Sequence, residues 1–370
     1  MKHLMLAALL TLACTHPPAA APPPPQKAVR KPVIQLAILL DTSNSMDGLI
    51  DQARTQLWRV VNEFGRARKR GEIPELHVAL YEYGNTRLAA ESGYIRQVLP
   101  FTTDLDLVSE ELFALQTSGG EEYCGQVIDE SVQRLRWSSH ADDLRVIFIA
   151  GNEPFTQGNV DYRTAVAKAT TRGIIVNTIF CGDKREGIRT DWGTGAQLAD
   201  GRYVAIDQNA RVAEIDTPFD AQIATLGTQL NDTYIAYGVE GTKGLQRQYA
   251  QDANLSSKKS ANVERQIAKS SVNYVNSAWD VVDAKKAGKS IEISDLPPAL
   301  RSMTPAQREA YIGKIAKERA ALQKRIAELD AERRKYIAAQ QKDLPAAQNT
   351  LDEAIVGAVR EAGRKRGFAF

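Results

Sequence analysis

Three oxygen-bearing side chains stand at alternate positions directly after an apolar run. Asp41, Ser43 and Ser45 follow Leu39 and Leu40, and a helical pattern begins behind them. A small hard cation such as Mg²⁺ prefers oxygen ligands in octahedral geometry and keeps some of its waters. Two serine hydroxyls could bind such an ion directly while the carboxylate supplies charge. The same residue types are common helix N-caps, so on this stretch alone a capping loop without a metal explains the pattern equally well.

The segments around this stretch alternate between strand and helix patterns. Apolar periodicity of the helical kind predicts helices at 49–67, 125–137, 161–171 and 219–237. Short apolar runs predict strands at 34–40, 76–83, 94–101, 145–150, 174–180 and 203–206. This order is typical of an α/β fold with a doubly wound, mostly parallel sheet covered on both faces. In such sheets ligands bind beyond the carboxyl ends of the strands, where Asp41 stands.

The pattern Asp-x-Ser-x-Ser at 41–45, between an apolar strand and an amphipathic helix, resembles the first loop of the metal-ion-dependent adhesion site in von Willebrand factor type A (VWA) domains. The resemblance extends over about residues 33–240. Ser-Gly-Gly at 118–120 is similar to the second site loop, and the strand 145–150 with Gly-Asn-Glu behind it is similar to the third. The resemblance implies the VWA fold, a Rossmann-like α/β architecture.

The site departs from the family's usual pattern at two positions. Glu121 stands where a threonine usually follows the two glycines, and Gly151 stands where the third loop usually has an aspartate. Glu121 could bind the ion directly and replace the lost charge, and a third-loop side chain could reach in. The resemblance therefore implies a site for Mg²⁺ or Mn²⁺ formed by Asp41, Ser43, Ser45, Glu121, Asn152 and Glu153.

This more anionic ligand set has a consequence for partners. It would bind the cation more tightly, but it would leave less positive charge to attract a carboxylate of a partner. Binding of metal and binding of a partner could therefore be separate here. The alternative is that Glu121 and Glu122 are simply acids of a first helical turn, which suit the helix dipole.

The chain has three cysteines, and two of them lie near the candidate site. Cys124 falls in the second loop and Cys181 directly follows the predicted fifth strand, so the resemblance places both at the same end of the sheet. Facing loops could bring their Cα atoms within the ~6 Å that a disulfide needs. We expect a Cys124–Cys181 disulfide; the alternative is two small buried hydrophobic residues.

The N-terminus has the pattern of an export signal. Lys2 and His3 precede an apolar run at 4–13, which is too short to span a bilayer. The run ends in Leu-Ala-Cys, which resembles the lipobox of bacterial lipoproteins, although Thr11 stands where an aliphatic residue is usual. We predict a signal peptide at 1–13, a lipidated Cys14 and a proline-rich linker at 14–32, hence a lipid anchor at the bacterial cell envelope. The alternative is an ordinary signal peptide cut near 19–21.

The composition changes near residue 240, so we predict a VWA domain at 33–240, a connector at 241–300, a long helix at 301–345 and a C-terminal helix and tail at 346–370. The long helix could form a coiled coil through two rows of residues spaced seven apart. One row is apolar and half of the other is charged: Ile315, Leu322, Leu329 and Tyr336, and Ile312, Arg319, Ile326 and Arg333. The alternative is a helix that lies back on the rest of the chain.

Composition and motifs bound the function. The net charge is +2, from 47 basic and 45 acidic residues, so nucleic acid is not an expected partner. The sequence has no Gly-x-Ser-x-Gly elbow, no phosphate-binding loop and no His-Glu-x-x-His helix. We therefore expect a non-enzymatic, envelope-anchored protein whose VWA domain binds a divalent cation and an unknown protein partner. One alternative is an envelope scaffold that acts through its helical C-terminal region with a vestigial metal site. A metal-assisted hydrolase is less favoured, and the oligomeric state stays open.

Overall fold

The computed structural model describes residues 30–210, 215–340 and 350–370. The predicted signal peptide, Cys14 and nearly all of the predicted linker lie outside the described residues. Residues 31–370 form one compact unit. None of the helices within the described residues has both the length and the apolar composition that a membrane span requires.

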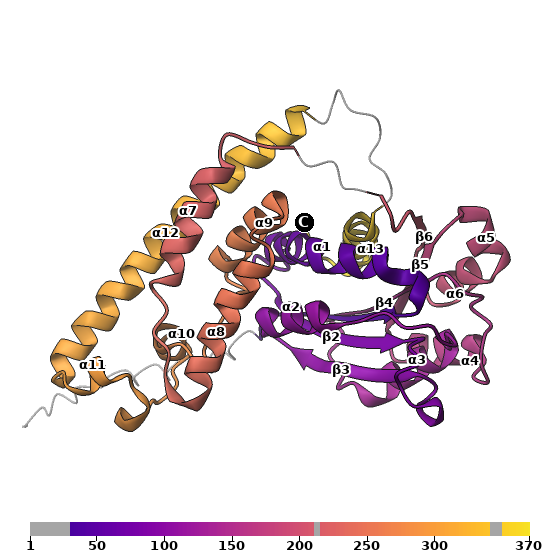
Figure 1. The fold of residues 1–370 in the computed structure, drawn as a ribbon, viewed down its shortest axis with the longest axis horizontal. Helices are drawn as coiled ribbons and strands as arrows, with labels where there is room; N and C mark the ends of the chain where they lie inside the picture. The colour runs from indigo at the N-terminus through magenta and orange to yellow at the C-terminus, as the bar shows by residue number, and fades with distance from the viewer. Residues whose placement is uncertain (1–29, 211–214, 341–349) are drawn as a thin grey trace, which may run out of the picture. The chain divides into compact units, whose positions relative to one another are not determined.

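Within the described residues, six strands form one sheet in the order β3-β2-β1-β4-β5-β6 (Figure 1). All neighbours are parallel except β2 and β3, which pair antiparallel. The strands are β1 (Val33–Asp41), β2 (Glu75–Tyr83), β3 (Ile95–Thr102), β4 (Leu144–Gly151), β5 (Ile175–Cys181) and β6 (Tyr203–Ile206). The central strand β1 is buried along its whole length, as its continuous apolar run predicts. The α/β fold class is confirmed.

Helices cover both faces of the sheet, and the side chains of β1 alternate between them. Ile34, Leu36 and Ile38 join the core under α1 (Asp47–Arg66), α2 (Leu105–Ala114) and α13 (Leu351–Lys365). Ala37 and Leu39 join the core of the opposite face, under α3 (Cys124–Arg134), α4 (Tyr162–Thr171) and α6 (Trp192–Leu198). In Figure 1, α1 and α13 lie on one side of the sheet and α3 and α4 on the other. A short helix, α5 (Lys184–Arg189), packs near β6.

A helical region follows the sheet. It consists of α7 (Asp220–Asn231), α8 (Gly238–Asn254), α9 (Lys259–Ser270), α10 (Val281–Lys286), the single turns η3 (Ile293–Asp295) and α11 (Pro298–Arg301), and the long α12 (Pro305–Gln340). The predicted helix 219–237 is too long, because side chains hold the backbone behind α7. Arg319 donates to the carbonyl oxygen of Thr233, and Asp280 accepts from the N–H of Ile235. The predicted boundaries at 240 and 300 stay predictions.

The long helix α12 lies against α7 and α9 (Figure 1). Its buried row is the half-charged one, Ile312, Arg319, Ile326 and Arg333, together with Leu329 and Asp330. The two arginines are buried because acids of neighbouring helices neutralise them: Arg319 pairs with Asp280 at 2.7 Å and Asp283 at 3.1 Å, and Arg333 with Asp220 at 2.9 Å and Glu264 at 2.7 Å. The helix therefore lies back on the chain, and the charged row that would disfavour a coiled coil is explained by these ion pairs.

Buried ion pairs also attach the helical region to the helices of the sheet. Arg265 of α9 is fully buried and contacts Asp106 of α2 at 2.7 Å and Asp252 of α8 at 2.5 Å. Its guanidinium lies 4.6 Å from the ring centre of Trp58 on α1. Lys269, also fully buried, contacts Asp252 at 2.8 Å. These contacts tie α9 to α1, α2 and α8.

Candidate functional site

The first site loop begins where β1 ends. Asp41 is fully buried, and its Oδ1 accepts the backbone N–H of Ser43 at 2.7 Å, which turns the chain away from the strand. A single 3₁₀ turn, η1 (Asn44–Met46), then leads into α1. The hydroxyl oxygens of Ser43 and Ser45 lie 3.3 Å apart. Neither Ser43 nor Met46 caps a helix through its side chain, so the polar side chains of this loop are not consumed by capping.

The third loop, behind β4, meets the first. The side-chain amide of Asn152 donates to the Ser45 hydroxyl at 3.1 Å. The backbone carbonyl of Glu153 accepts the indole N–H of Trp192 at 2.8 Å, which fixes the path of this loop. Glu153 is partly exposed, and its charge contributes to the raised pKa values of Asp41 and Glu122. The structure thus brings the first-loop and third-loop residues together.

In the second loop, the glutamate that lies near Asp41 is not the one that the sequence suggested. Glu121 is exposed, and its carboxylate accepts the hydroxyl of Tyr123 at 3.4 Å. Glu122 is buried, and its backbone N–H donates to the side chain of Gln157 at 2.6 Å, which ties the second loop to the third. The structure therefore places Glu122, and not Glu121, beside Asp41.

Gly84, behind β2, makes room for these two acids. A Cβ atom at this position would lie 2.8 Å from Cγ of Glu122 and 2.9 Å from Oδ1 of Asp41. The backbone φ of Gly84 is +77°, which also favours glycine. Because both acids border the same small volume, Asp41 and Glu122 are neighbours in space.

The surroundings of Gly151 explain why the third loop has no aspartate at this position. A Cβ atom there would lie 2.5 Å from the hydroxyl of Tyr83 and 3.1 Å from Oδ2 of Asp41. The Tyr83 hydroxyl donates to the carbonyl oxygen of Ala150 at 2.9 Å, so it is held in that position. The volume that an aspartate side chain would need is therefore taken by Tyr83.

We call this group the acidic cage; its members are Asp41, Ser43, Ser45, Glu122, Asn152 and Glu153. Burial, reinforced by the charges of Glu122 and Glu153, raises the pKa of Asp41 to about 8, although the Ser43 N–H opposes this. Burial and Glu153 raise the pKa of Glu122 to about 7. Oδ2 of Asp41 is buried and has no hydrogen-bond partner. Among the described residues, no lysine or arginine forms an ion pair with any acid of the cage.

The donor atoms of the cage are of the types that bind a divalent cation. It offers carboxylate, hydroxyl and amide oxygens, which are the ligands of a hard cation. Among the described residues, no three acidic, histidine or cysteine side chains are grouped to hold a metal by themselves, so the serine hydroxyls would be needed as ligands.

The expected disulfide is absent. Cys124 and Cys181 are both free and buried. They belong to the cores of opposite faces of the sheet, so the sheet separates their side chains. The Cys124 thiol lies 3.8 Å from the Tyr83 hydroxyl, and burial raises the pKa of both thiols, which disfavours the reactive thiolate form at neutral pH. The alternative of two small buried hydrophobic residues is the one that the structure shows.

Comparison with known proteins agrees with this geometry. Residues 35–190 match the family of von Willebrand factor type A domains. This segment is a VWA domain. It contains all six cage residues. No curated protein matches the chain.

Solved structures of distant similarity include proteins of several kinds. An aerotolerance-related membrane protein from Bacteroides fragilis is 16% identical, with 48% of this chain and 93% of that chain covered and a TM-score of 0.33. The VWA domain of SpRpn10 is 14% identical, with 47% and 88% covered and a TM-score of 0.35. A mussel byssus thread matrix protein with a zinc-occupied adhesion site is 8% identical, with 47% and 42% covered and a TM-score of 0.35.

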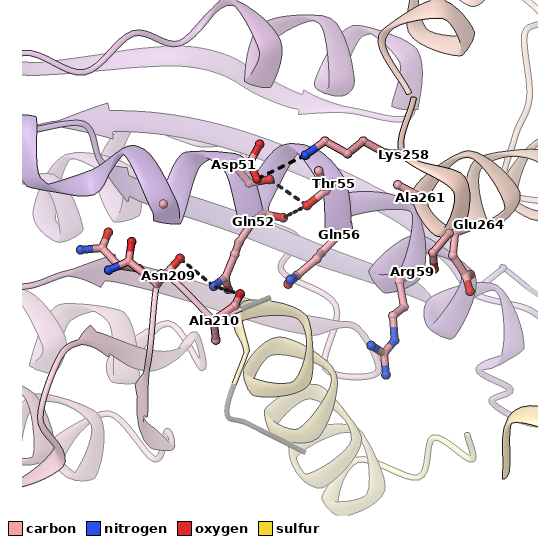
Figure 2. A pocket seen from close by; sticks show the side chains of 13 residues that line it. Asp51, Gln52, Thr55, Gln56, Arg59, Asn209, Ala210, Lys258, Ala261 and Glu264 are labelled. Carbon is pink, nitrogen blue, oxygen red and sulfur yellow. Dashed lines mark hydrogen bonds and ion pairs between the residues drawn. The ribbon is translucent and has the colours of Figure 1, made fainter. Parts of the chain in front are cut away.

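A polar cavity of about 680 Å³ lies beside α1, away from the acidic cage (Figure 2). Figure 2 shows Asp51 directed toward Lys258, at 3.9 Å, and Gln52 directed toward the loop that carries Asn209 and Ala210. The Gln52 amide donates to the carbonyl oxygens of Asp207 and Gln208, each at 2.9 Å. We assign no ligand to this cavity, because residues 211–214, which follow directly on its lining, lie outside the described part of the chain.

Proposed function

We propose that the VWA domain holds one divalent cation, Mg²⁺ or Mn²⁺, in the acidic cage and uses this site for the non-enzymatic recognition of a protein partner. Asp41 and Glu122 would supply the charge, Ser43 and Ser45 the hydroxyl ligands, and the third loop the remaining oxygens. Glu122 here takes the role for which the sequence suggested Glu121. The cation would link three loops that otherwise meet mainly through hydrogen bonds.

The uncompensated carboxylate of Asp41 supports this proposal most directly. A buried ionised group without a partner is costly, and proteins normally pair such a group or use it to coordinate a metal. Oδ2 of Asp41 has neither a hydrogen bond nor a cation, and Glu122 adds a second acid beside it. A bound cation would remove this cost, so the folded protein should gain stability from the metal.

The test compares two adjacent glutamates. Thermal unfolding and calorimetric titration with MgCl₂ and MnCl₂ are measured on the wild type and on Asp41→Ala, Glu122→Gln and Glu121→Gln. At a free metal concentration of about 100 times Kd, the wild type should gain about 2.7 kcal/mol. Asp41→Ala should abolish the gain, and Glu122→Gln should weaken metal binding by roughly tenfold, because ligand charge sets the affinity.

Glu121→Gln is the matched control, since it removes the same charge one residue away and outside the cage. Its metal affinity should stay within about twofold of the wild type, as expected for an exposed charge. The same metal response in the wild type and in Asp41→Ala would contradict the proposal. A loss in Glu121→Gln with no loss in Glu122→Gln would overturn the assignment of the ligand.

We also propose that the protein is displayed on the bacterial cell envelope by a lipid on Cys14. The proposal rests on the apolar run and the Leu-Ala-Cys sequence at 12–14, which lie outside the described residues. Incorporation of labelled palmitate by the full chain, lost in Cys14→Ser, tests it. Equal labelling of both proteins would contradict it.

A further inference from the structure

We propose that the surface beside the acidic cage receives a basic side chain, lysine or arginine, of the protein partner, and not the partner's carboxylate. This inference deepens the proposed function and rests on it. The surface consists of Tyr94, Tyr123 and Glu121, which we call the aromatic rim. None of these three residues is needed to hold the cation.

The aromatic rim has the composition of a receptor for a cation. The rings of Tyr94 and Tyr123 lie with their centres 6.0 Å apart and their planes at 60°, and both side chains are partly exposed. The Tyr123 hydroxyl donates to the exposed carboxylate of Glu121 at 3.4 Å. Aromatic ring faces and a carboxylate both attract an ammonium or guanidinium group. A basic side chain could therefore contact all three residues at once.

The rim borders the cage directly. Tyr123 is the residue after Glu122, whose side chain lies beside Asp41. The backbone carbonyl of Tyr94 accepts the N–H of Gly84 at 3.1 Å, and Gly84 is the residue that makes room for Asp41 and Glu122. A group that docks on the rim is thus held next to the cage, where Oδ2 of the fully buried Asp41 lacks a partner.

The charges of the site favour a cation over a carboxylate. Asp41, Glu122 and Glu153 carry three negative charges when ionised, which one divalent ion does not fully neutralise. Glu121 adds a further negative charge at the surface. Arg87, a basic residue of the loop between β2 and β3, donates a hydrogen bond to the side chain of Gln116. A partner's carboxylate would meet a negative potential even with the metal bound, whereas a lysine or arginine would be attracted.

Tyr94 offers a variant that separates binding from folding. Its φ is +56°, in the left-handed region, which glycine adopts without the cost that other residues bear. Tyr94→Gly removes the ring and suits this backbone, so its melting temperature should not fall in proportion to the loss of binding. A purely structural role of Tyr94 would predict a fall in melting temperature and unchanged peptide binding.

The experiment uses the full chain in MgCl₂ at physiological salt. Immobilised peptides of a Gly-Ser background carry one central lysine, arginine, glutamate or norleucine. The basic peptides should retain about fivefold more protein than the glutamate peptide, which corresponds to about 1 kcal/mol for an exposed cation–π and charge contact. Norleucine separates the charge from the alkyl chain; it should be retained less than the basic peptides and no less than the glutamate peptide.

Variants of the aromatic rim test whether its three residues cause the preference for basic peptides. Glu121→Gln, Tyr123→Leu and Tyr94→Gly should each lose most of the preference for basic peptides while metal affinity by calorimetry stays unchanged. Metal-dependent retention of the glutamate peptide at the level of the basic peptides, or equal retention of all four, would overturn the inference. Absence of metal binding by the wild type would overturn the proposed function alone, because the preference for basic peptides should then persist without metal.

Discussion

Two groups of buried carboxylates in this protein differ in what neutralises them. Where α2, α8 and α9 meet, Asp106 and Asp252 contact Arg265, and Asp252 also contacts Lys269. In the acidic cage, Asp41 is buried, as Asp106 is, but its charged neighbours are other acids. The first group is complete within the chain. The second lacks a positive charge, which is why we assign it to a ligand and the first to structure.

The pKa values of Asp252 and Asp41 move in opposite directions. Burial alone would raise the pKa of Asp252, but Arg265 and Lys269 lower it below its ordinary value. Burial raises the pKa of Asp41 to about 8, and Glu122 and Glu153 add to this. The comparison shows that the burial of an acid does not by itself indicate a site. A buried acid without a cation does, because shifted groups of this kind concentrate at functional positions.

The largest expected effect comes from breaking the complete group. Arg265→Met should lower the free energy of unfolding by about 3–5 kcal/mol, because Asp106 and Asp252 then lose their main counter-charge in the interior. Urea unfolding followed by circular dichroism measures it. Arg325→Met is the control, since Arg325 is half exposed and pairs with Glu328, and it should cost at most about 0.5 kcal/mol. Equal costs for both variants would remove the contrast on which the comparison depends.

A second variant tests the altered third loop. Gly151→Asp restores the side chain that the family usually has, but it collides with the Tyr83 hydroxyl and should cost about 1–3 kcal/mol. Tyr83→Phe removes that hydroxyl, so the double variant should lose less than the sum of the two single variants. Thermal unfolding of the four proteins gives this coupling. Additive losses would show that Tyr83 does not occupy the aspartate position.

A pH series in a chelator should show a gentler trend. The folded-state pKa values of Asp41 and Glu122, about 8 and about 7, lie above the ordinary values of 3.8 and 4.5 for these side chains. The folded state therefore holds more protons between these limits, and its stability is greatest at low pH and falls as pH rises toward 8. Melting temperatures from pH 5 to 8 measure the fall, which Asp41→Asn should flatten. A metal-free wild type that grows more stable over this range would contradict this account of the cage.

For the reduction of the cysteines we expect no effect on stability. Cys124 and Cys181, the cysteines of the described residues, are both free, so a reducing agent should leave the melting temperature unchanged. Alkylation in denaturant without prior reduction, followed by peptide mapping, should label Cys124 and Cys181 completely. A mass that corresponds to a linked peptide pair would restore the disulfide.

The sheet and the first loop could be predicted from sequence because their signals are local. Apolar runs located the strands, and Asp41, Ser43 and Ser45 converge as their spacing suggested. The choice between Glu121 and Glu122 could not be predicted. It depends on how closely the second loop approaches the loop behind β2, where a Cβ at Gly120 would lie 2.3 Å from the carbonyl oxygen of Gly84. The adjacent pair of glutamates carried no signal for that approach.

The predictions for the cysteines and for the half-charged row of α12 differ from the structure for two separate reasons. The error on the cysteines could have been avoided, since Cys181 has the same parity along β5 as Ile175 and Ile179 and so faces away from the core of α3. The role of the half-charged row on α12 could not be foreseen. The acids that neutralise Arg319 and Arg333 come from other helices, far away in the sequence.

The most direct test of the central claim is a crystal structure of the protein grown with MnCl₂, with an anomalous difference map collected at a wavelength where manganese scatters strongly. The account predicts one peak bounded by Asp41, Ser43, Ser45 and Glu122, with Glu121 outside its coordination. A map without a peak in the cage, or with the ion held by Glu121 in place of Glu122, would contradict it.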